Sequence, residues 1–355
     1  MLTKAPMVLL IAVASGIISG IAATALTLRV LERFTILDVP NQRSSHTRPT
    51  LRGGGIGLAA GTLVALAIAQ TNLVGSTWIV LLIAGIGFGA VGFVDDLTGA
   101  LPITIRLALQ FAAAAAVVAI LWDHASQGML AEFLVGAVAT FWIVSFVNAF
   151  NFMDGINGIS CAEIIVAGGA IGLLARHEHQ LALQAAAFAL VAGAIGFAPF
   201  NFPTARVFLG DVGSYFAGAW LAVLVVLGLR GSIPPEAIVA PVALYVADTG
   251  LTLARRVQRH EPWHEPHRQH AYQRLVVLGW SHKKTAGVVF TLVTMCALLG
   301  SVSLLGSVPG RVAADCGIVL LVVGYLDLPR RIEHRQSPSP RGGRPSRAFR
   351  FGADR

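Results

Sequence analysis

Three aspartates lie in short polar motifs at the ends of long apolar stretches, where carboxylates could hold a divalent cation. Asp95 and Asp96 are adjacent in the motif GFVDDL, and Asp211 lies among small residues in FLGDVGS. Neighbouring carboxylates beside hydrocarbon are costly unless a cation neutralises them. Their hard oxygen atoms favour Mg²⁺, which proteins hold with one or two carboxylates plus substrate phosphates. The alternatives are a solvated helix end for the pair and a helix N-cap for Asp211.

A second motif, NAFNFMDGING, repeats an amide or acid at every third residue. These residues are Asn148, Asn151, Asp154 and Asn157. In a helix or a 3₁₀ turn this spacing places them near one face. Capping explains one or two such residues, so we predict that the set hydrogen-bonds a polar ligand.

A third motif, WHEPHRQHAYQRL, carries His264, His267 and His270 at a spacing of three, with arginines between and after them. The spacing could suit zinc, but zinc sites usually add a cysteine or a further acid in a defined frame. A cationic cluster of histidine and arginine also suits a diphosphate. The diphosphate interpretation agrees better with the aspartates.

Basic residues gather in the motif DVPNQRSSHTRPTLRGGG, which contains Arg43, His46, Arg48 and Arg52. Membrane topology alone could require these arginines. The alternative is a guide for an anionic ligand such as a phosphorylated lipid or a nucleotide. We include Arg43 among the candidate substrate-binding residues on this basis.

The elements that must position these motifs are predicted to be membrane helices. The chain has 355 residues, of which 12% are charged and 55% hydrophobic, and its mean hydropathy is +0.72. An average soluble domain is about 25% charged, so an ordinary soluble enzyme is excluded. Spans of roughly 20 apolar residues predict an all-α polytopic membrane bundle with eleven helices, or ten if a short span fails to cross. The expected spans are 5–28, 54–70, 77–94, 103–122, 130–148, 158–175, 180–198, 213–230, 236–254, 285–307 and 311–328.

The positive charges predict how this bundle is oriented. Eleven spans place nearly all Lys and Arg at or beside one face, the exceptions being Lys4, Arg176, Arg230 and Arg311. Cytoplasmic loops are enriched in Lys and Arg, so we expect the N-terminus outside and the C-terminus in the cytoplasm. We expect one membrane domain over 1–328 and a basic, disordered tail over 329–355. All the motifs above fall on the cytoplasmic side, which predicts one site at the inner membrane surface.

Four further residues in apolar segments carry less information. Cys161, Cys296 and Cys316 show no paired or metal-binding spacing, so no chemistry is assigned to them. Asp248 lies inside the ninth span, where an acid is a functional candidate by default. The sequence assigns Asp248 no particular role.

Taken in order, the motifs resemble a known family, the polyprenyl-phosphate N-acetylhexosamine-1-phosphate transferases of glycosyltransferase family 4. The matching motifs are DVPNQRSSHTRPTLRGGGIG, GFVDDL, NAFNFMDGING, FLGDVGS and HRQHAYQRL. The resemblance implies an enzyme of the bacterial inner membrane that moves a sugar 1-phosphate from a UDP-sugar onto undecaprenyl phosphate and releases UMP. It implies Mg²⁺ as cofactor, with Mn²⁺ as a substitute.

The resemblance also implies roles for individual residues. Asp211 would be the principal Mg²⁺ ligand and Asp96 a second one. Asp95 and Asp96 would assist with metal, lipid phosphate or proton removal. The residues implied to bind the nucleotide-sugar and its diphosphate are Asn148, Asn151, Asp154, His267 and His270.

The donor sugar is only partly indicated. The peptidoglycan translocase of this family has a lysine shortly after its aspartate pair, whereas Leu97, Thr98, Gly99 and Ala100 follow Asp96 here. This argues against a muramoyl-pentapeptide donor. The HRQHAYQRL form resembles the branch that starts O-antigen or other surface polysaccharides, with UDP-GlcNAc, UDP-FucNAc or UDP-QuiNAc as donors.

The expected partners are undecaprenyl phosphate, a UDP-N-acetylhexosamine and membrane lipid, without nucleic acid, and a homodimer is left open. Two other classes compete with the transferase. A transporter of an anionic or lipid-linked solute would also be polytopic with an intramembrane acid, but no internal repeat is evident. A nonenzymatic subunit that binds lipid or nucleotide-sugar is the second alternative.

Overall fold

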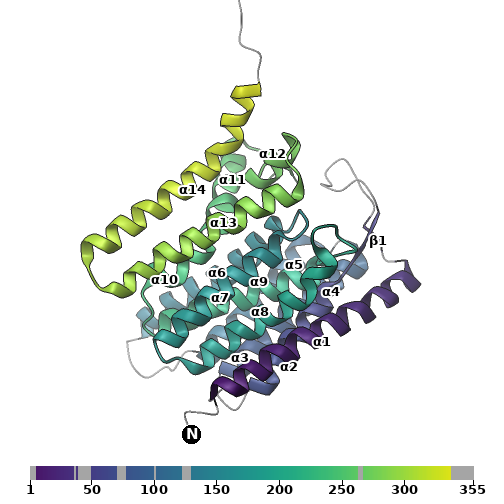
Figure 1. The fold of residues 1–355 in the computed structure, drawn as a ribbon, viewed down its shortest axis with the longest axis horizontal. Helices are drawn as coiled ribbons and strands as arrows, with labels where there is room; N and C mark the ends of the chain where they lie inside the picture. The colour runs from purple at the N-terminus through teal and green to yellow at the C-terminus, as the bar shows by residue number, and fades with distance from the viewer. Residues whose placement is uncertain are drawn as a thin grey trace, which may run out of the picture.

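The computed structural model describes residues 5–35, 37–38, 49–69, 77–99, 101–121, 129–262 and 267–336, which form a bundle of long helices (Figure 1). Ten helical segments of this described part are long and apolar enough to cross a membrane. The expected second span is a shorter apolar helix, α2, Gly55–Ala69. The predicted fold class, a polytopic helical membrane bundle, is confirmed.

Most expected spans are single helices, and two are composite. The third span joins α3 and α4 through a π-helical turn, Ile83–Gly87. The ninth joins α10 and α11 through a 3₁₀ turn, Ala240–Val242, where Pro241 has no N–H to donate. The helices are α1 Ala5–Phe34, α3 Thr77–Leu82, α4 Phe88–Thr98, α5 Ile103–Leu121, α6 Met129–Met153, α7 Ile159–His177, α8 Leu181–Asn201, α9 Gly210–Arg230, α10 Pro235–Val239, α11 Ala243–Gln258, α12 Ala271–Val277, α13 His282–Ser301 and α14 Val308–Gln336.

The last helix is longer than the sequence predicted. Residues 329–336 were expected to begin a disordered tail, but they continue α14. Arg331 donates to Asp327 one turn earlier at 2.7 Å, and Arg274 of α12 donates to Glu333 at 2.8 Å. These ion pairs favour helix beyond the apolar stretch. The rest of the expected tail lies outside the described residues.

Helix α9 forms the centre of the bundle (Figure 1). Of its most apolar stretch 89% is buried, against 22% for α1 and α14. Tyr215 and Trp220 of α9 are fully buried, and the Trp220 indole donates to the carbonyl of Ala186 at 3.1 Å. Outer helix α6 instead exposes large side chains such as Phe133 and Phe141. An apolar exterior of this kind fits hydrocarbon rather than water.

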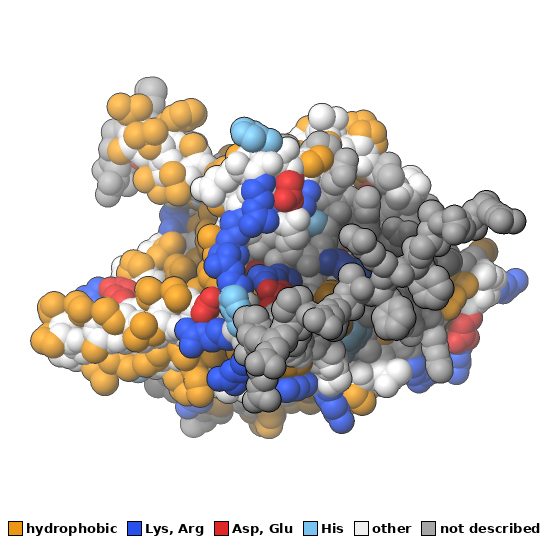
Figure 2. All heavy atoms as spheres, turned by 90° about the horizontal axis from the view of Figure 1, so that it is seen from above, with side chains coloured by type: hydrophobic (Ala, Val, Ile, Leu, Met, Phe, Trp, Pro, Cys, Tyr) orange, Lys and Arg blue, Asp and Glu red, His pale blue; other side chains and the backbone are white. Residues whose placement is uncertain are grey.

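Several helices meet at one end of the bundle, which we call the polar end. Here α1, α4 and α6 end, and α2 and α9 begin. Figure 2 looks onto this end. Charged and histidine side chains gather there, and hydrophobic side chains cover the flanks. The predicted motifs thus share one end, while its assignment to the cytoplasm stays a prediction.

A small sheet fixes the backbone at the polar end. Strand β1, Leu37–Asp38, is antiparallel to β2, Thr50–Arg52, and β2 is parallel to β3, Val207–Phe208. Arg52 is in register with Phe208. The pairing continues past the strands, because Gly55 N donates to the carbonyl of Leu209 at 2.8 Å. It sets the start of α2 beside the start of α9.

This contact needs a residue without a side chain. A Cβ built on Gly55 would lie 2.2 Å from Gly213 Cα, which is backbone and cannot rotate away. We predict that Gly55→Ala destabilises the protein by about 1–3 kcal/mol through overpacking. Thermal unfolding of the detergent-solubilised protein should show a lower melting temperature.

The matched control is Gly169→Ala in α7, where a Cβ would meet nothing within 4 Å. Alanine has the better helix propensity, so this variant should melt at or above the wild-type temperature. Equal melting of the two variants would contradict the close approach of α2 and α9.

Candidate functional site

Arg52 joins two of the three predicted aspartates at the polar end. Its Nε lies 2.7 Å from Asp96 Oδ1, and its Nη2 lies 2.9 Å from Asp211 Oδ2. Strand β2 supplies Arg52, the end of α4 supplies Asp96, and the first turn of α9 supplies Asp211. The two carboxylates raise the pKa of Arg52 even though burial alone would lower it. The guanidinium is therefore permanently charged.

Asp96 also fixes the start of α9. Its Oδ1 accepts from the backbone N–H of Asp211 at 3.0 Å, and its Oδ2 accepts from that of Val212 at 2.9 Å. A carboxylate at a helix N-terminus satisfies amides that lack intrahelical partners. The approach requires Gly92 on α4, because a Cβ there would lie 2.1 Å from the Asp211 carbonyl oxygen. Asp211 therefore lies within the first turn of α9 rather than at its N-cap, and Asp96 of α4 accepts the free N–H groups of that turn.

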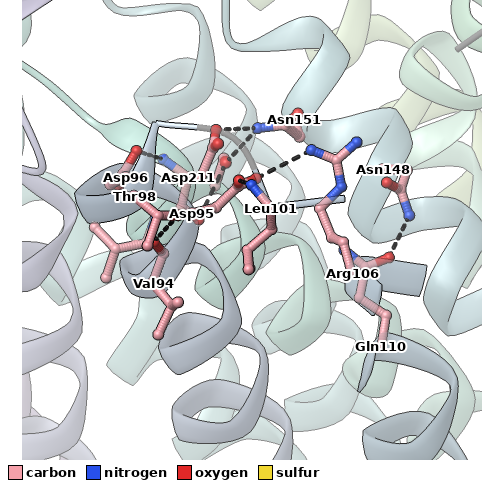
Figure 3. A network of polar contacts seen from close by, with 12 residues as sticks. Val94, Asp95, Asp96, Thr98, Leu101, Arg106, Gln110, Asn148, Asn151 and Asp211 are labelled. Atoms are coloured by element: carbon pink, nitrogen blue, oxygen red, sulfur yellow. Dashed lines mark hydrogen bonds and ion pairs between the residues drawn. The ribbon is translucent and has the colours of Figure 1, made fainter. Parts of the chain in front are cut away.

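Asp95 faces a different helix from its neighbour (Figure 3). Its Oδ2 lies 3.0 Å from Nη1 of Arg106 on α5, and its Oδ1 accepts from the backbone N–H of Leu101 at 2.8 Å. Consecutive residues of a helix point in different directions, so the pair divides between α5 and α9. Sequence reasoning did not identify Arg106. The signal for it was present, since a charge within an apolar span is a functional candidate.

Asn151 is the predicted amide that reaches the aspartates (Figure 3). Its Nδ2 donates to Asp211 Oδ1 at 2.8 Å and lies 2.9 Å from Ser214 Oγ. Asn148, one turn earlier on α6, donates instead to Gln110 Oε1 on α5 at 2.7 Å. Thus Asn148 and Asn151 bind different neighbours, and Gln110 and Ser214 join the network without having been predicted.

Asp154 and Asn157 lie in the turn that follows α6. Ser160 Oγ donates to Asp154 Oδ1, and Asn157 Nδ2 donates to the carbonyl of Pro203 at 3.3 Å. Burial raises the pKa of Asp154 to about 7, and the negative charge of Asp211 also raises it. The four residues therefore do not form one shared face. Asn151 contacts the cluster, and Asp154 is coupled to Asp211 through charge.

The histidine motif packs against the end of α6. The rings of His267 and His270 are 4.9 Å apart, and the Phe152 ring lies 6.3 Å from the first and 6.0 Å from the second. Burial, together with the nearby His270, lowers the pKa of His267 to about 4, so His267 is neutral at physiological pH. His267 is half-buried, whereas His270 is only 1% exposed. Within this structure His267 is the more accessible of the two rings.

Other predicted features are not placed. Arg43, His46, Arg48 and His264 lie outside the described residues. Within the described ranges no group of three or more His, Cys, Asp or Glu is arranged to hold a metal. A site built from two carboxylates and ligand oxygens remains compatible with the geometry, because the aspartates Asp95, Asp96 and Asp211 outnumber the guanidiniums of Arg52 and Arg106 that pair with them.

Comparisons with known proteins find a matching family model and several relatives. The model of a family described as glycosyl transferase family 4 matches residues 78–229, which include all three aspartates. A Bacillus subtilis (strain 168) protein described as a probable undecaprenyl-phosphate N-acetylglucosaminyl 1-phosphate transferase is 26% identical over 291 residues, covering 78% of this chain and 80% of that protein.

Two further relatives carry different descriptions. A decaprenyl-phosphate N-acetylglucosaminephosphotransferase of Mycolicibacterium smegmatis is 28% identical over 340 residues, covering 84% of this chain and 83% of that protein. A phospho-N-acetylmuramoyl-pentapeptide-transferase of Lactobacillus acidophilus is 29% identical over 286 residues, covering 73% and 84%.

The raised pKa of Asp154 predicts a pH-dependent stability. Its folded-state pKa of about 7 lies above the ordinary value of about 4, so the folded protein binds this proton more tightly than the unfolded chain. The resulting stability is fully present below about pH 4 and is lost as the pH rises through about 7. Between about pH 5 and 8, the melting temperature of Asp154→Asn should therefore fall less than that of the wild type. Parallel curves would contradict a proton held by Asp154.

Proposed function

We propose that this chain, whose residues 78–229 match the model of glycosyl transferase family 4, transfers an N-acetylhexosamine 1-phosphate from a UDP-sugar to undecaprenyl phosphate. The product is a lipid diphosphate sugar, and UMP is released. The protein is an enzyme that transfers sugar phosphates to a polyprenyl phosphate. The observation that carries the finer proposal is the cluster of Arg52, Asp96 and Asp211 beside Asn151.

The carboxylate oxygens of Asp211 and Asp96 are suitable ligands for Mg²⁺. Asp211 and Asp96 share one cationic partner, so their oxygens already converge on a position that favours positive charge. Mg²⁺ is commonly held by one or two carboxylates together with phosphate oxygens and water. Asp211 would be the main ligand, because its oxygens contact the side chains of Asn151 and Arg52, which can rotate, whereas both oxygens of Asp96 accept backbone N–H groups. When bound, Mg²⁺ would neutralise charge on the donor diphosphate.

The reaction joins two anions. An oxygen of the lipid phosphate forms a bond to the donor's β-phosphorus, and the bond from that phosphorus to the bridging oxygen breaks. UMP leaves with the bond's electron pair. The guanidiniums of Arg52 and Arg106 lie where they can offset the anionic charge, and both are held by carboxylates. Asp95 need not act as a base, because a phosphate monoester with a second pKa of about 6 is already mostly ionised.

Other residues would bind the donor. Asn151 and Asp154 would hydrogen-bond the nucleotide-sugar near Asp211. Asn148 would act through Gln110, which it already contacts. His267 would contact the diphosphate as a neutral hydrogen-bond partner, and His270 would pack against the His267 ring. Arg43 would attract the anionic donor by its positive charge.

Several finer points belong to the same proposal. The donor is UDP-GlcNAc, UDP-FucNAc or UDP-QuiNAc, since the sequence after Asp96 lacks the lysine of the muramoyl-pentapeptide enzymes. The product starts O-antigen or another surface polysaccharide at the cytoplasmic face of the bacterial inner membrane. Mn²⁺ would substitute for Mg²⁺.

A transporter agrees less well with the structure. Its binding site would be expected near mid-membrane. The described carboxylate cluster lies instead at the polar end, and Asp248, the intramembrane acid that suggested transport, is engaged in structural contacts. Transfer between a soluble nucleotide and a membrane lipid requires a site where both can meet, and the polar end offers one.

The central experiment measures nucleotide release by purified protein in detergent. With undecaprenyl phosphate, Mg²⁺ and a panel of UDP-N-acetylhexosamines, the wild type should produce UMP and a lipid diphosphate sugar. Asp211→Asn should lower turnover about a hundredfold or more, because it removes transition-state charge stabilisation. Chelation should stop the wild-type reaction, and added Mg²⁺ should restore it. Release of UDP, or binding of a UDP-sugar without any turnover, would contradict the proposal.

Arg52 provides a second prediction. Arg52→Lys keeps the charge but cannot contact Asp96 through one nitrogen and Asp211 through another. We expect turnover to fall about tenfold for this variant and further for Arg52→Ala. The control is Arg176→Lys at the opposite end of the bundle, which should match the wild type. An unchanged kcat for Arg52→Lys would show that the paired geometry is not needed.

A further inference from the structure

Asp248 of α11 is a buried acid whose oxygens are occupied by protein donors. Both of its oxygens lie 3.0 Å from the backbone N–H of Ala271, the first residue of α12. The Tyr325 hydroxyl of α14 donates to Oδ2 at 2.9 Å, and the Thr252 hydroxyl donates to Oδ1 at 3.3 Å. The side chain is 1% exposed. Asp248 is therefore not accessible to substrate, and its contacts link α11 to α12 and α14.

Asp248 joins α11 to the next helix, α12, and to α14, which is remote in sequence. Helices α11, α12 and α14 lie together beside the polar end (Figure 1). A buried carboxylate is tolerated when surrounding donors replace its lost hydration. Because those donors come from three helices, Asp248 specifies where the start of α12 sits relative to α11 and α14.

The contact extends to the histidine motif. His270 Nδ1 lies 3.4 Å from Asp248 Oδ1, and His270 is the residue immediately before α12. The His270 ring in turn lies against the rings of His267 and Phe152. Displacing His270 would therefore displace His267, the accessible ring of the pair.

A second contact from the same face of α11 involves Glu261 and Gln269, which lie between α11 and α12. Arg256, two helical turns beyond Asp248, pairs with Glu261 Oε2 at 3.1 Å. Gln269 Nε2 donates to that same oxygen at 2.8 Å. Residues spaced by four lie on one helix face, so α11 holds the loop at two places.

We propose that Asp248 is a positioning residue for the donor site: by fixing His270 and the first turn of α12, it sets the place of His267 at the polar end. This inference rests on the proposed function, in which His267 contacts the donor diphosphate. Asp248 takes no part in bond making. Its removal should weaken use of the UDP-sugar while leaving use of the lipid largely intact.

The test compares Asp248→Asn and Tyr325→Phe with the wild type. Asparagine replaces one acceptor oxygen with a donor, and phenylalanine removes only the hydroxyl. We expect KM for the UDP-sugar to rise about tenfold or more in Asp248→Asn and by a smaller factor in Tyr325→Phe. KM for undecaprenyl phosphate should stay within about twofold of the wild type. Asp327→Asn, an exposed acid on α14 that pairs with Arg331, is the matched control and should leave both constants unchanged.

Hydrogen–deuterium exchange provides a readout that does not depend on catalysis. Amides of the segment 267–277 should exchange faster in Asp248→Asn than in the wild type or in Asp327→Asn. If the wild type turns over no UDP-sugar, the proposed function fails, while the exchange result still tests the positioning. Unchanged exchange with an unchanged KM would overturn the inference. An equal rise in both KM values with a lower melting temperature would overturn it in favour of a general stability role.

Discussion

A guanidinium between two carboxylates is the interaction on which the polar end depends. Arg52, Asp96 and Asp211 come from segments far apart in the chain, and each is costly to bury alone near hydrocarbon. Together they compensate one another. Asp96 adds a direct restraint on the backbone of α9, so a change in this contact would reach the central helix of the bundle.

Close backbone approach makes that interaction possible. The start of α2 contacts α9 through Gly55, and α4 contacts the Asp211 peptide through Gly92. Membrane helices associate through packing and hydrogen bonding, with little hydrophobic driving force between them, and small residues let their backbones come close. The short sheet adds the last restraint by placing Arg52 opposite Phe208. The contacts of Arg52 with Asp96 and Asp211 therefore require the close packing of these glycines.

The two charged groups within apolar spans, Arg106 and Asp248, have distinct roles. Arg106 satisfies Asp95 and brings a positive charge toward the cluster. Asp248 accepts hydrogen bonds from Ala271 and Tyr325, and it contacts His270 of the histidine motif. An acid within a membrane helix is a functional candidate, yet its function here is exerted through another residue. The proposed donor site consequently depends on α11 and α14 as well as on the helices that carry the aspartates.

The sequence by itself predicted the polytopic helical fold and four of the polar residues that meet at the polar end. A membrane helix must satisfy its backbone polar groups within its own segment, so hydropathy predicts spans locally. Asp95, Asp96, Asp211 and Asn151 were all predicted, and the structure places them together at one end. The resemblance to glycosyl transferase family 4 lies in the order of the motifs, which does not depend on how the helices pack.

Only the tertiary structure decided which group binds which. Asp95 pairs with Arg106, whereas Asp96 and Asp211 pair with Arg52. Asn148 contacts Gln110, whereas Asn151 contacts Asp211. His270 is buried, and His267 is the more accessible ring. The tertiary structure also extended α14 into the expected tail. Residue spacing states which way a side chain points on its own helix but not which helix lies opposite. Partner choice depends on that second fact, because charges and hydrogen bonds act over a few ångströms between segments remote in sequence.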